Sequence, residues 1–348
     1  MRILITGGAG FIGANVADHH LAAGDDVVIF DNLSRPGTTG NLAWLHGRHG
    51  DRFTVVSGDI RDFGAVWAAL WPTADRVYHL AAQVAVTTSV KDPRNDFEVN
   101  ALGTFNVLEA VRQFAPDAVV VYASTNKVYG RMEDLAIVEE PTRYRYRDHP
   151  FGISEDRPLD FHSPYGCSKG CGDQYVRDYA RIYGLRTVVM RQSCIYGTRQ
   201  FGIEDQGWLA HFCIAVRHGR PITIYGDGKQ VRDVLWIDDL VAAYDAAAEH
   251  IDVARGQVYN VGGGPANTVS AWAEFGSALE ELAGEPIDVS FAGWRPGDQP
   301  VYVSDIRRAQ RDLGWSPRVS LEEGLQRLWT WVDAEIELFA EVPRVKAG

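Results

Sequence analysis

A glycine-rich segment directly after the first apolar run constrains the fold of this chain more than any other feature. The run Met1-Arg2-Ile3-Leu4-Ile5 leads into Gly7-Gly8-Ala9-Gly10-Phe11-Ile12-Gly13, which fits G-x-G-x-x-G from Gly8 and G-x-x-G-x-x-G from Gly7. Glycines at this spacing let backbone N–H groups approach a pyrophosphate at a helix N-terminus, where the peptide dipoles favour negative charge. A plain strand-to-helix turn has the same pattern, so the surrounding sequence has to decide between the two.

Short β-branched runs alternate along the chain with longer segments of helical spacing. Strands are expected at 3–6, 27–30, 54–57, 77–80, 119–124 and 187–191, with helices at about 11–23, 62–71, 92–114 and 165–183. This alternation predicts βαβ units and a parallel sheet covered on both faces. Six strands in this order make an α/β fold with a doubly wound, nucleotide-binding sheet.

Beyond residue 191 the alternation loosens, which predicts a second, smaller lobe. A helix is expected near 208–217 and a short strand at 222–225. Strand and helix character returns at 234–250 and 258–261, before final helices near 270–282 and 321–338. We therefore predict a dinucleotide-binding domain of residues 1–192 plus 237–269 and a substrate lobe of residues 193–236 plus 270–342. A chain of 348 residues is long enough for both.

The charge balance and the cysteines limit the partners. With 34 Lys+Arg against 46 Asp+Glu the net charge is −12, which repels nucleic acids and anionic membrane surfaces. No apolar run approaches the ~20 residues of a membrane span, and no secretory signal is recognised, so we expect a cytoplasmic protein. The four cysteines form no Cys-x-x-Cys pair and are expected to be reduced, with no metal site, at positions Cys167, Cys171, Cys194 and Cys213.

Acidic residues after the second and third strands bear on the choice of dinucleotide. Asp31 ends the second strand, where a carboxylate accepts hydrogen bonds from the adenosine ribose and repels a 2′-phosphate. Asn32 and Leu33 bring no compensating charge, so NAD is favoured over NADP. Asp59, in Gly58-Asp59-Ile60 after the third strand, fits either an adenine contact or a turn that caps the next helix.

A tyrosine and a lysine carry the chemistry that the sequence suggests. Tyr165 and Lys169 are four residues apart at the start of an expected helix, about 6 Å from each other on one face. A cation there would stabilise the phenolate and lower a pKa that is otherwise about 10. Ser124-Thr125 ends the fifth strand, at the sheet edge where such folds bind ligands. The set suits proton transfer from a substrate hydroxyl, although a surface tyrosine beside a solvated lysine has the same spacing.

Short motifs over nearly the whole chain resemble the extended short-chain dehydrogenases/reductases, a Rossmann-fold family that acts on nucleotide sugars. They are the glycine motif, Asp31, Leu80-Ala81-Ala82-Gln83, Asn100, Ser124-Thr125, Val128-Tyr129-Gly130, Tyr165-x-x-x-Lys169 and Arg232-Asp233. The resemblance implies that NAD contacts Gly7, Gly10, Phe11, Ile12, Gly13, Asp31, Asn32, Asp59, Ile60, Leu80, Ala81, Ala82, Gln83, Asn100, Ser124, Tyr165 and Lys169.

Longer segments resemble, more narrowly, the CDP-tyvelose epimerases, also called CDP-paratose 2-epimerases. These segments are residues 124–130, 160–170, 205–208 and 228–233. The resemblance implies an isomerase that inverts C2 of a CDP-linked 3,6-dideoxyhexose with NAD, through a transient 2-keto sugar. Its implied catalytic residues are Thr125, Tyr165 and Lys169, and its implied substrate contacts are Asn126, Lys127, Cys194, Gln206, Arg232 and Arg295.

Departures from neighbouring subfamilies support this choice. Sugar-nucleotide dehydratases carry an Asp-Glu pair after the catalytic threonine, where this chain has Asn126-Lys127. The 4-epimerases usually carry Asn where Cys194 stands, and the segment between Gly130 and Ser163 is longer here than expected for them. That segment fits either a lid over the sugar or a solvated loop.

Two other functions and the assembly stay open at this point. A 4-epimerase of a UDP- or CDP-hexose would use the same residues, and a non-catalytic NAD-sensing protein is the remote alternative. In the resembling family the helices at 92–114 and 165–183 form a two-fold interface, which implies a homodimer or homotetramer. The apolar residues that fit either that interface or the core are Val99, Leu102, Val107 and Val111.

Overall fold

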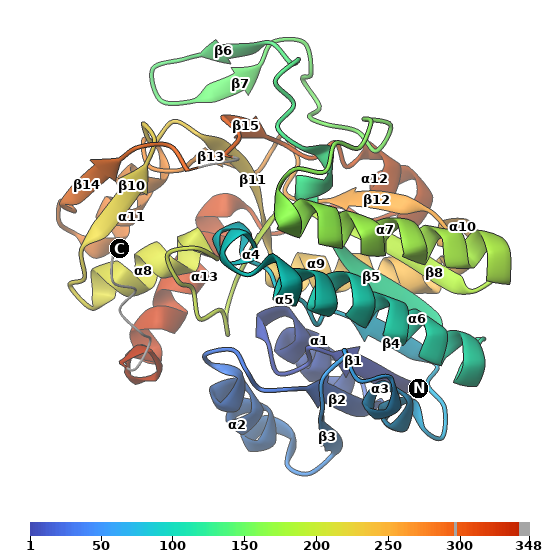
Figure 1. Ribbon diagram of the computed structural model, residues 1–348. Helices are drawn as coiled ribbons and strands as arrows, with labels where there is room; N and C mark the ends of the chain where they lie inside the picture. Colours follow the sequence, from blue (N-terminus) through green and yellow to red (C-terminus); the bar gives the residue numbers. More distant parts are fainter. Residues whose placement is uncertain (296–297, 341–348) are drawn as a thin grey trace.

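A parallel sheet of seven strands forms the centre of the computed structural model, which describes residues 1–295 and 298–340 (Figure 1). The strand order is β12-β8-β5-β4-β1-β2-β3, which is the doubly wound arrangement that the sequence predicts. Six of the strands lie within two residues of their predicted bounds, and the seventh, β12, is the return of the chain to the first lobe. The bounds are β1 (Arg2–Thr6), β2 (Asp26–Asp31), β3 (Phe53–Ser57), β4 (Arg76–His79), β5 (Val119–Thr125), β8 (Arg186–Gln192) and β12 (Val258–Val261).

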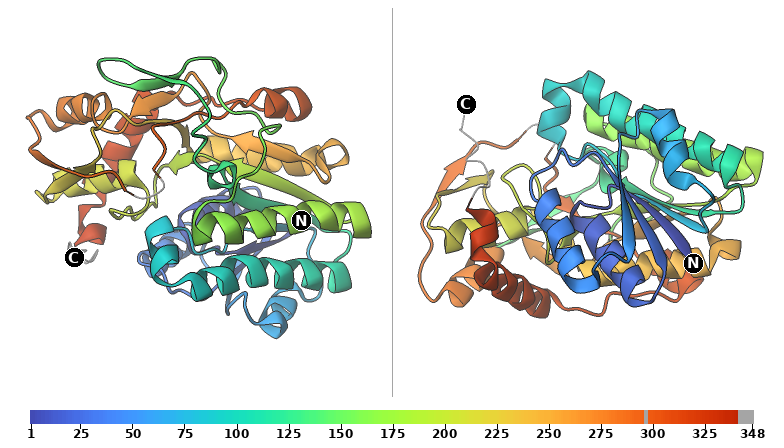
Figure 2. Two further views of the ribbon diagram at one scale, coloured as in Figure 1. Left: turned by 45° about the horizontal axis from the view of Figure 1, so that its top comes forward. Right: turned by 90° about the horizontal axis from the view of Figure 1, so that it is seen from below.

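Helices cover both faces of this sheet, and each face has its own apolar core (Figure 2). Alternate residues of a strand point to opposite faces, so Ile3 and Ile5 lie in one core and Leu4 lies in the other. One layer contains α1 (Phe11–Ala22), α2 (Thr38–His49) and α9 (Ile237–Glu249), and the other contains α3 (Phe63–Leu70), α6 (Gly103–Phe114) and α7 (Ser163–Tyr183).

Two helices of the first lobe differ from the prediction. α2 was not expected, because Gly40, Gly47 and several polar residues interrupt its apolar spacing. The helix predicted at 92–114 consists of α5 (Pro93–Phe97), a π-helical turn η1 (Glu98–Leu102) and α6. Asp92 caps α5 by accepting a hydrogen bond from the backbone N–H of Asn95 at 3.0 Å. The short helices α4 (Val86–Lys91) and α10 (Ile251–Ala254) complete the lobe.

The second lobe is built around β11 (Val231–Trp236), which leads directly into α9 of the first lobe. β11 pairs with β9 (Cys194–Tyr196), β13 (Thr268–Ser270) and β15 (Val301–Tyr302), and β10 (Ile222–Tyr225) pairs with β14 (Val289–Ala292). The helix predicted at 270–282 begins later, at Phe275, because residues 268–270 form β13. The helices are α8 (Trp208–Arg217), α11 (Phe275–Ala283), α12 (Arg307–Leu313), α13 (Leu321–Ala334) and the 3₁₀ turn η3 (Ile336–Phe339). Positions 296, 297, 341 and 342 of the predicted substrate lobe lie outside the described residues.

The long segment after Gly130 forms a hairpin that docks on the second lobe. After a 3₁₀ turn, η2 (Asn126–Tyr129), the strands β6 (Ile137–Glu139) and β7 (Tyr144–Tyr146) pair antiparallel (Figure 1). Arg143 donates two hydrogen bonds to the carboxylate of Glu274, at 2.5 and 2.6 Å. The backbone N–H of Tyr144 donates to the carbonyl of Lys229 at 3.1 Å. These contacts fix the hairpin to the edge of the sheet around β11.

None of the helices among the described residues is long and apolar enough to cross a lipid bilayer.

Candidate active site

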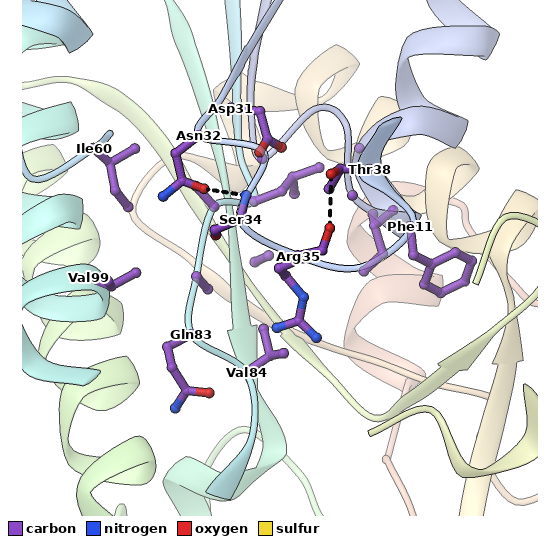
Figure 3. A pocket seen from close by; sticks show the side chains of 18 of the residues that line it. Phe11, Asp31, Asn32, Ser34, Arg35, Thr38, Ile60, Gln83, Val84 and Val99 are labelled. Carbon is purple, nitrogen blue, oxygen red and sulfur yellow. Dashed lines mark hydrogen bonds between the residues drawn. The ribbon is translucent and has the colours of Figure 1, made fainter. Parts of the chain in front are cut away.

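A cavity of about 460 Å³ lies at the carboxyl edge of the parallel sheet, between the ends of β1 to β5 and a segment of the second lobe (Figure 3). Seventeen of the residues predicted from sequence to bind cofactor or substrate line it. They are Gly7, Gly10, Phe11, Ile12, Gly13, Asp31, Asn32, Asp59, Ile60, Leu80, Ala81, Ala82, Gln83, Ser124, Tyr165, Lys169 and Gln206.

The glycines of the first turn make a wall on which no side chain fits. Gly7 has φ +72°, and a Cβ there would lie 2.7 Å from the backbone nitrogen of Ala81. A Cβ on Gly13 would lie 2.2 Å from the carbonyl oxygen of Gly7. Gly10 precedes α1 and has no side chain to cap its first N–H groups, and this start of the helix, residues 10–13, lines the cavity. This bare helix start fits the pyrophosphate of a dinucleotide.

Asp31 is held in place by the same glycine-rich turn. One carboxylate oxygen accepts a hydrogen bond from the backbone N–H of Ala9 at 3.0 Å, and the other accepts from that of Leu33 at 2.8 Å. Burial raises the pKa of Asp31, while these two bonds act in the opposite direction. The carboxylate is therefore rigid and still has lone pairs for ribose hydroxyls.

The carboxylate of Asp59 is already engaged. It accepts hydrogen bonds from the guanidinium of Arg61 at 2.8 and 3.0 Å and from the amide of Asn32 at 3.1 Å. The hydrogen bonds from Arg61 are the largest cause that lowers the pKa of Asp59 to about 2. Asp59 thus organises the turn after β3 and the position of Asn32, and it lines the cavity as part of that turn.

Tyr165 and Lys169 stand on α7 with Thr125 close to the tyrosine. Their exposed fractions are 8% and 3%. Burial raises the pKa of Tyr165 to about 12, and the hydroxyl of Thr125 acts in the opposite direction. Burial lowers the pKa of Lys169 to about 7, and its Nζ lies 4.3 Å from the ring centre of Tyr122. In the protein alone, burial thus raises the pKa of Tyr165, contrary to the expectation that Lys169 lowers it.

A buried ion pair that the sequence analysis missed supports these residues. Asp173 accepts hydrogen bonds from the guanidinium of Arg191 at 2.9 Å on each carboxylate oxygen, and from the hydroxyl of Ser124 at 2.7 Å. Asp173 and Arg191 are 0% and 2% exposed. The spacing was available as a signal, because Asp173 follows Lys169 by four residues on the same helix.

Of the predicted cofactor contacts, Asn100 alone lies behind the cavity wall rather than in it. Its amide oxygen accepts from the backbone N–H of Gln83 at 2.9 Å, and its amide nitrogen donates to the carbonyl of Gln83 at 2.9 Å. Asn100 is 1% exposed, and it holds Gln83 against the cavity.

Family comparisons agree with this geometry. Residues 4–328 match the family described as GDP-mannose 4,6 dehydratase. The chain belongs to this family.

Among its relatives is the CDP-paratose 2-epimerase of Salmonella typhi, which is 46% identical over 342 residues that cover 96% of this chain and 100% of that protein. A solved UDP-glucose 4-epimerase of Thermotoga maritima with UDP-glucose has a TM-score of 0.82 and 31% identity, over 97% of this chain and 100% of its own. The UDP-glucose 4-epimerase of Thermus thermophilus in complex with NAD has a TM-score of 0.80 and 32% identity, over 96% of this chain and 100% of its own. The chain is thus an enzyme of the nucleotide-sugar epimerase and dehydratase class.

The predicted substrate contacts of this family member do not all reach the cavity. Gln206 lines it, whereas Asn126, Lys127, Cys194, Arg232 and Arg295 do not. The predicted catalytic residue Thr125 also lies outside the lining. Burial lowers the pKa of Lys127 to about 8, and Arg232 is the next cause in the same direction. Burial raises the pKa of Cys194, which Arg232 opposes. Lys127, Cys194 and Arg232 therefore lie near one another.

The two arginines predicted to bind the diphosphate differ in their partners. Arg295 forms ion pairs with Glu204 at 3.4 Å and Asp205 at 3.5 Å, and its guanidinium lies 3.7 Å from the ring centre of Tyr225. Arg232 has no carboxylate partner among the described residues and donates to the carbonyl of Val231 at 2.8 Å.

Sequence reasoning also missed two segments that meet over the cavity, one from each lobe. Arg35 follows β2 and points toward Gln83 and Val84 (Figure 3). Its guanidinium donates a hydrogen bond to the side-chain oxygen of Gln206. A Cβ on Gly37 would lie 2.2 Å from the ring of Phe201. The only signal was position, since a cation three residues after Asn32 lies close to the predicted ribose site.

Proposed function

We propose that this enzyme inverts C2 of a CDP-linked 3,6-dideoxyhexose with NAD, through a transient 2-keto sugar. The near full-length identity of 46% to a CDP-paratose 2-epimerase carries the proposal. The residues of the cavity support it, because they offer a pyrophosphate cradle, a fixed ribose acceptor and a buried tyrosine and lysine in one space.

The cofactor is NAD, held by the domain of residues 1–192 plus 237–269, and the lobe of residues 193–236 plus 270–342 binds the nucleotide sugar. Asp31 would accept from the adenosine ribose, and the turn from Gly7 to Gly13 would hold the pyrophosphate. When bound, NAD accepts a hydride from the sugar carbon and returns it to the other face of that carbon.

Tyr165 takes and returns the proton of the sugar 2-hydroxyl. With a pKa of about 12 in the protein alone, its phenol is protonated at neutral pH, so added positive charge nearby is needed for it to act as a base. Lys169 supplies charge next to the nicotinamide ribose, and Thr125 hydrogen-bonds the same sugar oxygen. The 2-keto sugar then rotates in the pocket, so that the opposite face of its carbonyl carbon is presented before the carbon is reduced again.

The pair after Thr125 argues against water elimination. Asn126 has an amide side chain, which neither donates nor accepts a proton as an acid or base, and Lys127 is a cation near Arg232. Elimination needs a proton donor for the leaving hydroxyl and a base for the carbon-bound proton, and this pair supplies no carboxyl group for either task. Lys127 and Asn126 suit contacts to sugar hydroxyls, and Cys194, Gln206, Arg232 and Arg295 would hold the rest of the nucleotide sugar.

A 4-epimerase is the second candidate, favoured by the 0.82 TM-score to the Thermotoga maritima enzyme. NMR of the products from a panel of CDP- and UDP-hexoses separates the two. Inversion at C2 of a CDP-sugar, with deuterium at C2 retained, is expected. Inversion at C4 alone, or solvent hydrogen entering at C2, contradicts the proposal. Binding of NAD without turnover of any sugar would instead indicate a sensing protein.

Exposed apolar side chains on the layer of α5, η1, α6 and α7 support a homodimer or homotetramer. Val107 and Val111 are buried in the core, whereas Leu102 is 40% exposed. Other large apolar side chains are also exposed on α5, α6 and α7, namely Phe97, Phe105, Phe114, Tyr175, Ile182 and Tyr183. A paired assembly would cover this face. A monomeric mass by light scattering at micromolar concentration would count against it.

A further inference from the structure

A buried carboxylate without a cation partner lies directly behind the residues proposed to carry the chemistry. Asp96 is 0% exposed. It accepts hydrogen bonds from the hydroxyl of Ser168 at 2.5 Å, from the amide of Gln83 at 2.6 Å and from the amide of Asn100 at 3.2 Å. All three donors are neutral. Asp96 forms no ion pair within the part of the chain that the structure describes.

The three donors come from three different segments of the site. Gln83 lies in the cavity-lining loop after β4, Asn100 lies in the π-helical turn, and Ser168 precedes Lys169 on α7. The hydroxyl of Ser168 also lies 3.1 Å from the amide nitrogen of Asn100. Asp96 lies in α5 four residues before Asn100, so the π-helical turn that follows α5 brings both side chains to the same buried point. One carboxylate therefore fixes the loop that contains Gln83, the π-helical turn η1 and the helix α7 relative to one another.

Two carboxylates act on the charge of Lys169, and they are not equivalent. Asp173 and Asp96 both favour the charged form of Lys169 against burial. Asp173 has the larger effect of the two, but it is already paired with Arg191, which donates two hydrogen bonds to it, so the net field of that ion pair at Lys169 is smaller than that of Asp173 alone. Asp96 has only neutral donors, and its negative charge is unbalanced. The other titratable groups near Lys169 are Tyr165 on α7, Tyr122 on β5 and His79 on β4. Burial and, to a lesser degree, the charge of Lys169 lower the pKa of His79 to about 3.

We propose that Asp96 is a positioning residue that ties the Gln83 loop to α7 and favours the charged form of Lys169. The proposal rests on the role given to Lys169 in the proposed function. It adds a residue with a different task, because Asp96 lies behind the cavity wall and acts through Lys169, Gln83 and Ser168.

The few lysines of the chain allow a direct test in the full-length protein. There are five, Lys91, Lys127, Lys169, Lys229 and Lys346. Protein labelled with ¹³C at the lysine ε-carbon gives one signal from each, and Lys169→Met identifies the signal of interest. Its pH titration is compared in the unaltered protein, in Asp96→Asn, and in Ser168→Ala, which removes one donor and keeps the charge.

We expect the midpoint of Lys169 to fall by about one pH unit in Asp96→Asn and to stay within a few tenths in Ser168→Ala. An equal midpoint in all three proteins overturns the proposal. Asp96→Ser removes the same charge with a smaller side chain, so it gives the same test where Asp96→Asn does not fold. A Lys169 midpoint that does not move in Asp96→Ser counts against the proposal.

Turnover adds a readout that a purely structural role would not change. Loss of the Asp96 charge lowers the pKa of both Lys169 and Tyr165, so the whole pH–rate profile of Asp96→Asn should move to lower pH. Asp96→Glu should restore part of the original profile. A uniform loss at every pH would show packing alone and would refute the charge role. The lysine titration needs no sugar substrate, so failure of the C2 assignment would be seen separately, in the product analysis.

Discussion

The two sides of the cavity are built in different ways. On the dinucleotide side, the lining residues follow directly on strands β1 to β5, which are neighbours in one sheet, and backbone atoms form much of the wall. On the sugar side, the candidate contacts lie on β9, β11 and connecting segments of small sheets, and they meet through charged side chains. The dinucleotide side is a wall formed largely by main-chain atoms, whereas the sugar side is formed by side chains.

This difference separates what the fold requires from what the individual enzyme requires. A side chain cannot be added to the main-chain wall without displacing main-chain atoms. A Cβ on Gly13, for example, would lie 2.2 Å from the carbonyl oxygen of Gly7. The side chains around Arg232 and Arg295 can change without altering the sheet. We therefore expect changes on the first side to affect NAD binding and stability together, and changes on the second side to affect the sugar alone.

The largest effect is expected at the point where both sides meet, the phenol of Tyr165. Tyr165→Phe removes the proton acceptor, so kcat should fall by about three tenfold steps while the affinity for CDP changes little. Turnover is measured by NMR and CDP affinity by calorimetry. Tyr175→Phe, on the exposed face of the same helix, is the matched control and should retain full activity. A variant at Tyr165 that keeps a tenth of the original kcat would rule out this role.

The same contrast explains how much could be predicted from the sequence. The ends of β1 to β5 carry short contiguous motifs, and strands that are adjacent in the sheet bring Gly7, Asp31 and Gln83 together without further information. In contrast, Arg35 and Asp173 were missed, because their partners Gln206 and Arg191 are distant in sequence. α2 was missed because its glycines hide the apolar period, and the burial of Tyr165 could not be derived from a four-residue spacing.

The next largest effect is expected at the glycine wall of the dinucleotide side. Gly13→Ala places a Cβ 2.2 Å from the carbonyl oxygen of Gly7, so the first turn must shift. We expect NAD affinity to fall about a hundredfold and the free energy of unfolding to fall by about 1–3 kcal/mol, a typical cost of overpacking. Gly47→Ala is the control, since a Cβ there meets nothing within 4 Å and replaces a glycine inside α2. That variant should gain stability by about 0.5–1 kcal/mol and keep its NAD affinity. Equal NAD affinity in both variants would show that backbone atoms do not form this wall.

The third prediction compares the two arginines of the sugar side. Arg232 has no carboxylate partner among the described residues, whereas Arg295 is engaged by Glu204 and Asp205. Arg232→Met should therefore weaken CDP binding by about tenfold to a hundredfold, as expected for a lost charge-assisted bond, and Arg295→Met should weaken it less. NAD affinity, measured by calorimetry on the same proteins, should stay unchanged. A larger loss in Arg295→Met would reverse this order and place the diphosphate nearer to Tyr225.

The smallest effect is expected for Arg35, which joins the two sides. Its guanidinium donates to Gln206 across the lobes, and it attracts the charges of Asp31 and ionised Tyr165. If this link transmits the occupancy of one site to the other, CDP should bind a few times more tightly with NAD present than without it. Arg35→Met should bring that ratio close to one, and by reciprocity it should remove the effect of CDP on NAD affinity. Arg48→Met is the control, because Arg48 is exposed on α2 and pairs with Asp18 away from the cavity. If Arg35→Met left this ratio of CDP affinities with and without NAD unchanged, Arg35 would not couple the two sites, and the main-chain wall and the sugar-side residues would bind their ligands independently of it.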